Sequence, residues 1–82
     1  MIFTNEEVNK LNELLENGGV FLKVPNDKKK PVEVLKADGN GSWQRLEVLG
    51  TTLACKIRQR YNYDIPMKFH MVYLKTFIAN NC

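Results

Sequence analysis

Residues able to carry out nucleophilic or metal chemistry are few in this chain of 82 residues, and they are widely spaced. The chain has one serine, Ser42, and one histidine, His70, and neither stands in a motif that pairs a nucleophile with a base. Cys55, His70 and Cys82 are possible metal ligands, but they lack the two close pairs typical of zinc sites. We therefore expect no catalytic residue, no metal site, no cofactor and no enzymatic activity.

Because catalytic motifs are lacking, we expect the function to depend on a binding surface. The charged residues that could form one are unevenly distributed along the chain. Residues 1–17 hold four glutamates and one lysine, whereas residues 18–82 hold eleven basic and five acidic residues, within a formal net charge of +3. A basic surface with an exposed aromatic plane and a guanidinium favours contact with phosphates and bases. The candidate binding residues are Lys28, Lys29, Lys30, Trp43, Arg45, Lys56, Arg58 and Arg60.

The first element that could position such a surface is a helix beginning at Asn5. Thr4 and Glu7 have the spacing of a capping box, in which each side chain bonds the backbone of the other residue. Apolar residues then recur at helical spacing from Val8 to Leu15. The helix should end at 17–19, where Gly18 suits a left-handed cap.

Three strands should follow this helix. The first is the short apolar run Val20–Val24, and the next two, 31–37 and 42–49, flank a turn at 38–41 that contains both Asp-Gly and Asn-Gly. Strand parity divides this hairpin into two faces. We expect the core face to carry Glu33, Leu35, Ala37, Gln44, Leu46 and Val48. The other face then carries Val32, Val34, Lys36, Trp43, Arg45 and Glu47.

The segment 51–61 fits two periods. As a helix it places Leu53, Ala54, Ile57 and Tyr61 on one face, with Thr51 or Thr52 as cap. As a strand it shows apolar and polar residues that alternate almost without exception. The abundance of Leu, Ala, Lys, Arg and Gln favours the helix.

The last predicted element is a strand from Met67 to Ile78, which should be central because both of its faces are apolar. Twelve residues would extend roughly 40 Å, beyond the reach of the shorter strands beside it. Part of it would then pair with a second copy of the chain, which predicts a homodimer or higher oligomer. The candidate interface residues are Phe69, Met71, Tyr73 and Phe77.

Together these elements predict an α+β fold, with 1–82 forming a single small domain of order α-β-β-β-α-β and a mainly antiparallel sheet. If 51–61 is a strand, the alternative is one helix followed by a five-stranded small barrel. With 44% hydrophobic and 26% charged residues, the composition is that of a folded domain and not of a disordered chain.

The function predicted from these observations is non-enzymatic binding. No stretch is apolar over the length of a membrane span and the start lacks a signal pattern, so we expect a cytoplasmic protein without membrane contact. Nine asparagines and nine lysines suggest AT-rich codons, as in a low-GC bacterium or a phage. The first hypothesis is an adaptor or inhibitor of a protein partner, such as a phage-type accessory factor. The second is a nucleic-acid-binding protein using Lys28–Lys30, Lys56, Arg58 and Arg60.

Overall fold

The computed structural model describes residues 3–60 and 68–81, and it has an α+β fold with an antiparallel four-stranded sheet. The elements follow the order α1 (Asn5–Leu15), β1 (Val20–Pro25), β2 (Glu33–Ala37), β3 (Trp43–Val48), α2 (Thr51–Arg58), β4 (Phe69–Tyr73) and α3 (Leu74–Asn81). The strands lie side by side as β3-β2-β1-β4. The predicted class and the predicted order α-β-β-β-α-β are confirmed, with one additional helix at the end.

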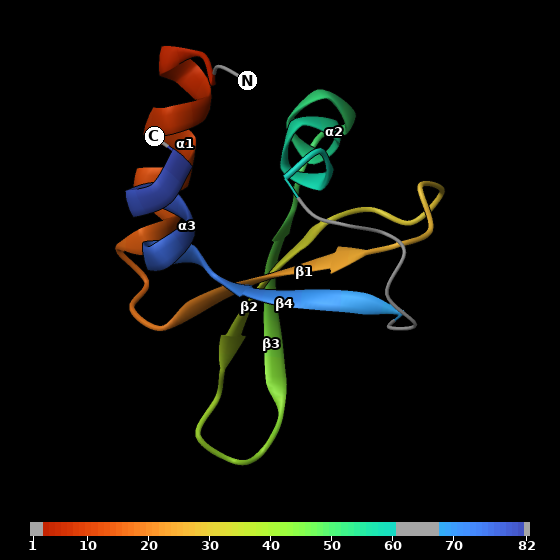
Figure 1. Ribbon diagram of the computed structural model, residues 1–82. Coiled ribbons are helices and arrows are strands. Elements are labelled where there is room, and N and C mark those ends of the chain that lie inside the picture. Colours follow the sequence, from red (N-terminus) through yellow and green to blue (C-terminus); the bar gives the residue numbers. More distant parts are fainter. Residues whose placement is uncertain (1–2, 61–67, 82) are drawn as a thin grey trace.

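The three helices lie on one side of the sheet, and the turn between β2 and β3 projects away from them (Figure 1). The core fills the space between the helices and this side of the sheet. From β1 it takes Val20, Leu22 and Val24, which alternate along the strand. The helices contribute Leu11 and Leu14 from α1, Leu53, Ala54 and Ile57 from α2, and Leu74 and Phe77 from α3.

Helix α1 begins where the capping box predicts. The backbone N–H of Glu7 donates to Thr4 Oγ1 at 3.1 Å, and the backbone N–H of Thr4 donates to Glu7 Oε1 at 2.8 Å. Gly18, which follows the helix, has a φ of +93°, a value that other residues adopt only with strain. Both ends of this helix therefore follow from local sequence chemistry.

The β2–β3 hairpin is confirmed, but the face assigned to its core side was wrong along β2 and at Val48, whereas Leu46 packs against the core as expected. Val32 and Val34 are fully buried, whereas Ala37 and Val48 are exposed. Val34 pairs with Glu47 while Leu35 pairs with Arg45, so Leu46 is an extra residue in a β-bulge. The bulge changes the parity along β3, and this places Trp43, Arg45 and Val48 all on the side away from the helices.

Residues 51–58 form a helix, as the residue types favoured. Its N-cap residue is Gly50, so neither Thr51 nor Thr52 is the cap, and no side chain makes a capping hydrogen bond. Leu53, Ala54 and Ile57 are buried as expected, and Tyr61 lies outside the described residues.

The long final strand was wrong in both length and position. It ends at Tyr73, and the chain continues as α3; β4 lies at the edge of the sheet and not at its centre. Leu74 and Phe77 are spaced three apart, which places both on the buried face of a helix. The ring of Phe77 packs edge-on against Phe3 with 5.8 Å between centroids. Burial of these two side chains against the core explains why a helix replaces the strand.

Candidate binding face of the sheet

The side of the sheet away from the helices is open, because no helix of the described chain covers it (Figure 1). The strand register determines which side chains lie there, since residues paired across neighbouring strands share a face. Phe21 pairs with Leu35 and Tyr73, and Leu35 pairs with Arg45. Residues two positions away along each strand lie on the same face, because side chains alternate between the two faces. We call this surface the open sheet face. It comprises Phe21, Lys23, Glu33, Leu35, Trp43, Arg45, Val48, Phe69, Met71 and Tyr73.

The open sheet face collects the exposed apolar side chains of the described protein. Every exposed large hydrophobic residue among residues 3–60 and 68–81 belongs to it: Trp43 at 48%, Val48 at 43%, Tyr73 at 40%, and Phe69 and Met71 at 37% each. Single exposed apolar residues are common on protein surfaces, whereas a set gathered on one face is typical of interaction sites.

Ring contacts hold the aromatic side chains of this face in place. The ring of Phe21 lies 5.3 Å from that of Trp43 in an edge-on contact and 5.1 Å from that of Tyr73 in a tilted one. At the other end of β4, Lys23 Nζ lies 4.7 Å from the centre of the Phe69 ring, a cation–π distance. Trp43, Phe21 and Tyr73 therefore form a connected row across the sheet, and Phe69 lies beside Lys23 at the other end of β4.

The charges on the open sheet face nearly balance. Arg45 Nη1 lies 3.6 Å from Glu33 Oε2, and Lys23 is the remaining charged residue of the set. The face is thus mainly apolar, with a small positive charge at the end where Lys23 and Phe69 meet.

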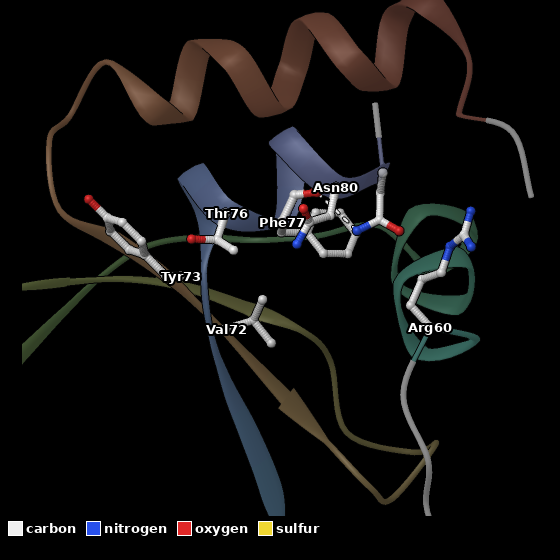
Figure 2. A pocket seen from close by; sticks show the side chains of 7 residues that line it. Arg60, Val72, Tyr73, Thr76, Phe77 and Asn80 are labelled. Atoms are coloured by element: carbon white, nitrogen blue, oxygen red, sulfur yellow. Dashed lines mark hydrogen bonds between the residues drawn. The ribbon is translucent and has the colours of Figure 1, made fainter.

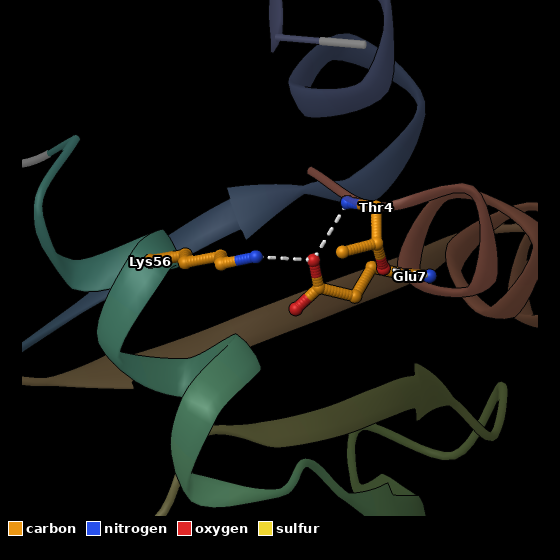
Figure 3. Close-up of polar contacts among 3 residues, drawn as sticks. All are labelled: Thr4, Glu7 and Lys56. Carbon is orange, nitrogen blue, oxygen red and sulfur yellow. Dashed lines mark hydrogen bonds and ion pairs between the residues drawn. The ribbon is translucent and has the colours of Figure 1, made fainter. Parts of the chain in front are cut away.

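Among the predicted basic residues, Lys56 is engaged inside the fold. Its Nζ lies 2.6 Å from Glu7 Oε1, the same oxygen that accepts the backbone N–H of Thr4 (Figure 3). The hydrogen bond from Lys56, followed by the backbone bond from Thr4, lowers the pKa of Glu7 below its ordinary value of 4.5. Lys56 therefore connects α2 to the start of α1.

Arg58 is also engaged, because it is buried at 9% exposure. Its Nε donates to the Pro25 carbonyl at 3.2 Å, and its Nη2 donates to the carbonyls of Asp27, at 3.4 Å, and Lys30. The guanidinium thus holds the loop after β1. Arg60, two residues past the end of α2, is exposed.

The three lysines of that loop are exposed. Asp27 shapes the loop, since its Oδ1 accepts the Lys29 N–H at 2.9 Å and its carbonyl accepts the Lys30 N–H at 3.0 Å. The predicted basic cluster is therefore divided: Lys28–Lys30 and Arg60 reach solvent, whereas Lys56 and Arg58 stabilise the fold.

A pocket of about 260 Å³ lies at the end of the open sheet face, lined by Lys23, Lys30, Lys68, Glu33 and Phe69 with two prolines. We call it the lysine pocket. Lys23 and Lys68 were not predicted as site residues, because Lys23, Lys30 and Lys68 meet only through the pairing of β1 with β4 and the loop that Arg58 holds. Phe21 was not predicted either, and Leu35 and Val48 were assigned to the core side, because the face that each occupies depends on the register and the bulge.

A second pocket of about 500 Å³ lies beside α3 (Figure 2). Its lining includes Arg60 after α2, Val72 of β4, and Thr76 and Asn80 of α3. Phe77 lines this pocket but is only 2% exposed, so its assignment to an oligomer interface was wrong: its side chain is part of the core. Phe69, Met71 and Tyr73, by contrast, are exposed.

Residues considered for chemistry are separated in the described chain. Ser42 stands at the β2–β3 turn, beside β3, whereas His70 is half-buried in β4 at the opposite edge of the sheet. Within residues 3–60 and 68–81, no group of three His, Cys, Asp or Glu side chains could hold a metal ion, and no helix is long and apolar enough to span a membrane. Cys82 lies outside the described residues.

Comparisons with known protein families, with curated proteins and with solved structures found no match.

Proposed function

We propose that this protein is a non-catalytic binding protein, an adaptor or an inhibitor, that engages a protein partner through the open sheet face. One observation carries the proposal: among residues 3–60 and 68–81, the exposed large apolar side chains gather on this single face. Burying such a set is the main driving force for most protein–protein association.

The composition of the face supports a protein partner. Trp, Tyr, Phe, Met and Arg are the residue types enriched at protein interfaces, and all five types occur on it. Five exposed apolar side chains contribute to the area: Trp43, Val48, Phe69, Met71 and Tyr73. Taking about 200 Å² for a large side chain, their exposure of roughly two fifths leaves about 400 Å² of apolar surface. That is about half of the roughly 800 Å² that one partner contributes to a standard interface.

Nucleic-acid binding through Lys28–Lys30, Lys56, Arg58 and Arg60 receives less support. Lys56 and Arg58 make intramolecular contacts at the distances given above, and Arg58 is buried. Binding a phosphate would require these side chains to leave their present partners. A protein partner needs no such rearrangement.

The proposal can be tested by placing a charge on the open sheet face. Met71→Lys introduces one positive charge at an exposed position of β4, and Asn12→Lys introduces the same charge on the exposed side of α1. Wild type, carrying an affinity tag, should capture a defined protein from the source cells. Met71→Lys should reduce that capture at least tenfold, and Asn12→Lys should leave it unchanged.

Two measurements complete this test. Trp43 is the single tryptophan of the chain and lies on the proposed interface, so its fluorescence should change when the captured protein is added. Light scattering behind a sizing column shows whether the partner is a second copy of the chain, as the sequence predicted. Equal capture by the two folded variants would refute the proposed interface.

A further inference from the structure

The lysine pocket is continuous with the open sheet face, because Lys23, Glu33 and Phe69 belong to both. Lys30 and Lys68 add two more ammonium groups around it, and both side chains are exposed. An apolar surface of the described protein therefore ends in a hollow where three positive charges face one carboxylate.

The contacts in the pocket leave it with a positive balance. Glu33 supplies the carboxylate of the pocket lining. Arg45, outside the pocket on the open sheet face, has its Nη1 3.6 Å from Glu33 Oε2. Lys23 is placed over the Phe69 ring at 4.7 Å, which fixes its position without neutralising its charge. The pocket thus favours an anionic group next to apolar side chains.

We propose that the lysine pocket binds carboxylates of an acidic segment in the protein partner, beside the apolar residues that lie on the open sheet face. This inference rests on the proposed function and names the chemistry of the partner. The partner segment carries large apolar side chains over Trp43, Met71 and Tyr73, and aspartate or glutamate where it reaches Lys23, Lys30 and Lys68.

The distribution of charge favours a peptide over a nucleic acid. A nucleic-acid strand carries a phosphate at every nucleotide, so a strand crossing the sheet needs cations along its whole path. Between the lysine pocket and Trp43 the open sheet face offers Arg45, which lies beside Glu33, and otherwise the apolar side chains of Leu35, Val48 and Met71. A protein segment can be acidic at one end and apolar over the rest, which matches this surface.

The probe for the pocket is a blocked hexaglutamate peptide, followed by nuclear magnetic resonance of the amide signals. Blocked hexaglutamine is the uncharged control, and hexathymidylate represents a single-stranded nucleic acid. The variant Lys23→Gln/Lys68→Gln removes two charges from the pocket. The matched control Lys36→Gln/Lys75→Gln lowers the net charge equally but outside the pocket.

Hexaglutamate should shift the amide signals of Lys23, Lys30, Lys68 and Phe69, and hexaglutamine should not. Its affinity should fall about tenfold in Lys23→Gln/Lys68→Gln, as expected for losing two ion pairs and their long-range attraction, and by much less in the control variant. Equal weakening in both variants, shifts spread over other lysines, or tighter binding of hexathymidylate in the pocket would overturn the inference.

Failure of this inference can be told apart from failure of the proposed function. If Met71→Lys abolishes capture of the partner but Lys23→Gln/Lys68→Gln does not, the open sheet face is the interface and the acidic segment is wrong. If Met71→Lys leaves capture unchanged, the proposed function itself is wrong, whatever the peptide does.

Discussion

Replacement of Arg58 should destabilise the protein strongly, even though arginine is usually a surface residue. The guanidinium is buried and donates to three backbone carbonyls, that of Pro25 at the end of β1 and those of Asp27 and Lys30 in the loop that follows. In Arg58→Met an unbranched side chain fills part of the same space, but all three hydrogen bonds are lost. The carbonyls are then left without these partners in a partly buried place.

The expected loss follows from these contacts. A hydrogen bond from a charged group contributes roughly 1.5–3 kcal/mol, and the bond to Asp27 is long at 3.4 Å, so we count the other two. This gives a loss of about 4 kcal/mol, similar to the roughly 3–5 kcal/mol lost when a buried ion pair is broken. A chain of 82 residues has a total free energy of unfolding of about 4–12 kcal/mol. Arg58→Met should therefore remove a third or more of the stability.

Urea unfolding followed by circular dichroism measures this loss. Arg45→Met is the matched control, because its side chain is 62% exposed and its ion pair with Glu33 spans 3.6 Å; it should lose less than about 1 kcal/mol. Arg58→Lys keeps the charge but not the planar fork, and should fall between the two. If Arg58→Met loses no more than Arg45→Met, the buried guanidinium is not what holds the loop.

Two further predictions concern stability. Since the pKa of Glu7 is lowered in the folded state by Lys56 and Thr4, its stabilising contribution is present above the ordinary pKa of 4.5 and is lost as the pH falls through the lowered value. Urea midpoints measured across this range should fall less steeply in Glu7→Gln than in wild type; parallel curves would contradict the assignment. Ile57→Ala should lower the free energy of unfolding by about 3 kcal/mol because Ile57 is fully buried. Val48→Ala, at a position that is 43% exposed, should lower it by less than about 1 kcal/mol. Equal losses in the two variants would contradict the burial of Ile57 in the core.

Elements marked by local chemistry could be predicted from the sequence. The capping box of Thr4 and Glu7 involves residues three apart, and the Asp-Gly and Asn-Gly pairs of the hairpin turn act within four residues. Gly39 and Gly41 both have positive φ values in that turn, as such pairs predict. These signals need no knowledge of the rest of the fold.

Features that depend on distant contacts could not be predicted in the same way. The bulge at Leu46 is decided by how β3 fits β2 and α1, where Lys10 Nζ meets Glu47 Oε2 at 2.6 Å. The change from strand to helix at Leu74 has no Gly or Pro to mark it, and it depends on Phe77 packing against Phe3 near the other end of the chain. The lysine pocket likewise unites Lys23 and Lys68, which are far apart in sequence.

The error in placing the last strand has a physical cause that bears on function. The segment 67–78 was predicted as a strand that is apolar on both faces, which in most sheets indicates a central strand covered by two layers. In this protein the helices cover one face, so Val72 packs against the core while Phe69, Met71 and Tyr73 reach solvent on the other. Because these three side chains, like Trp43, remain 37–48% exposed, they contribute less to folding than their size allows. Polar residues would serve solubility better at such positions, and the partner that we propose for this face would account for the apolar ones.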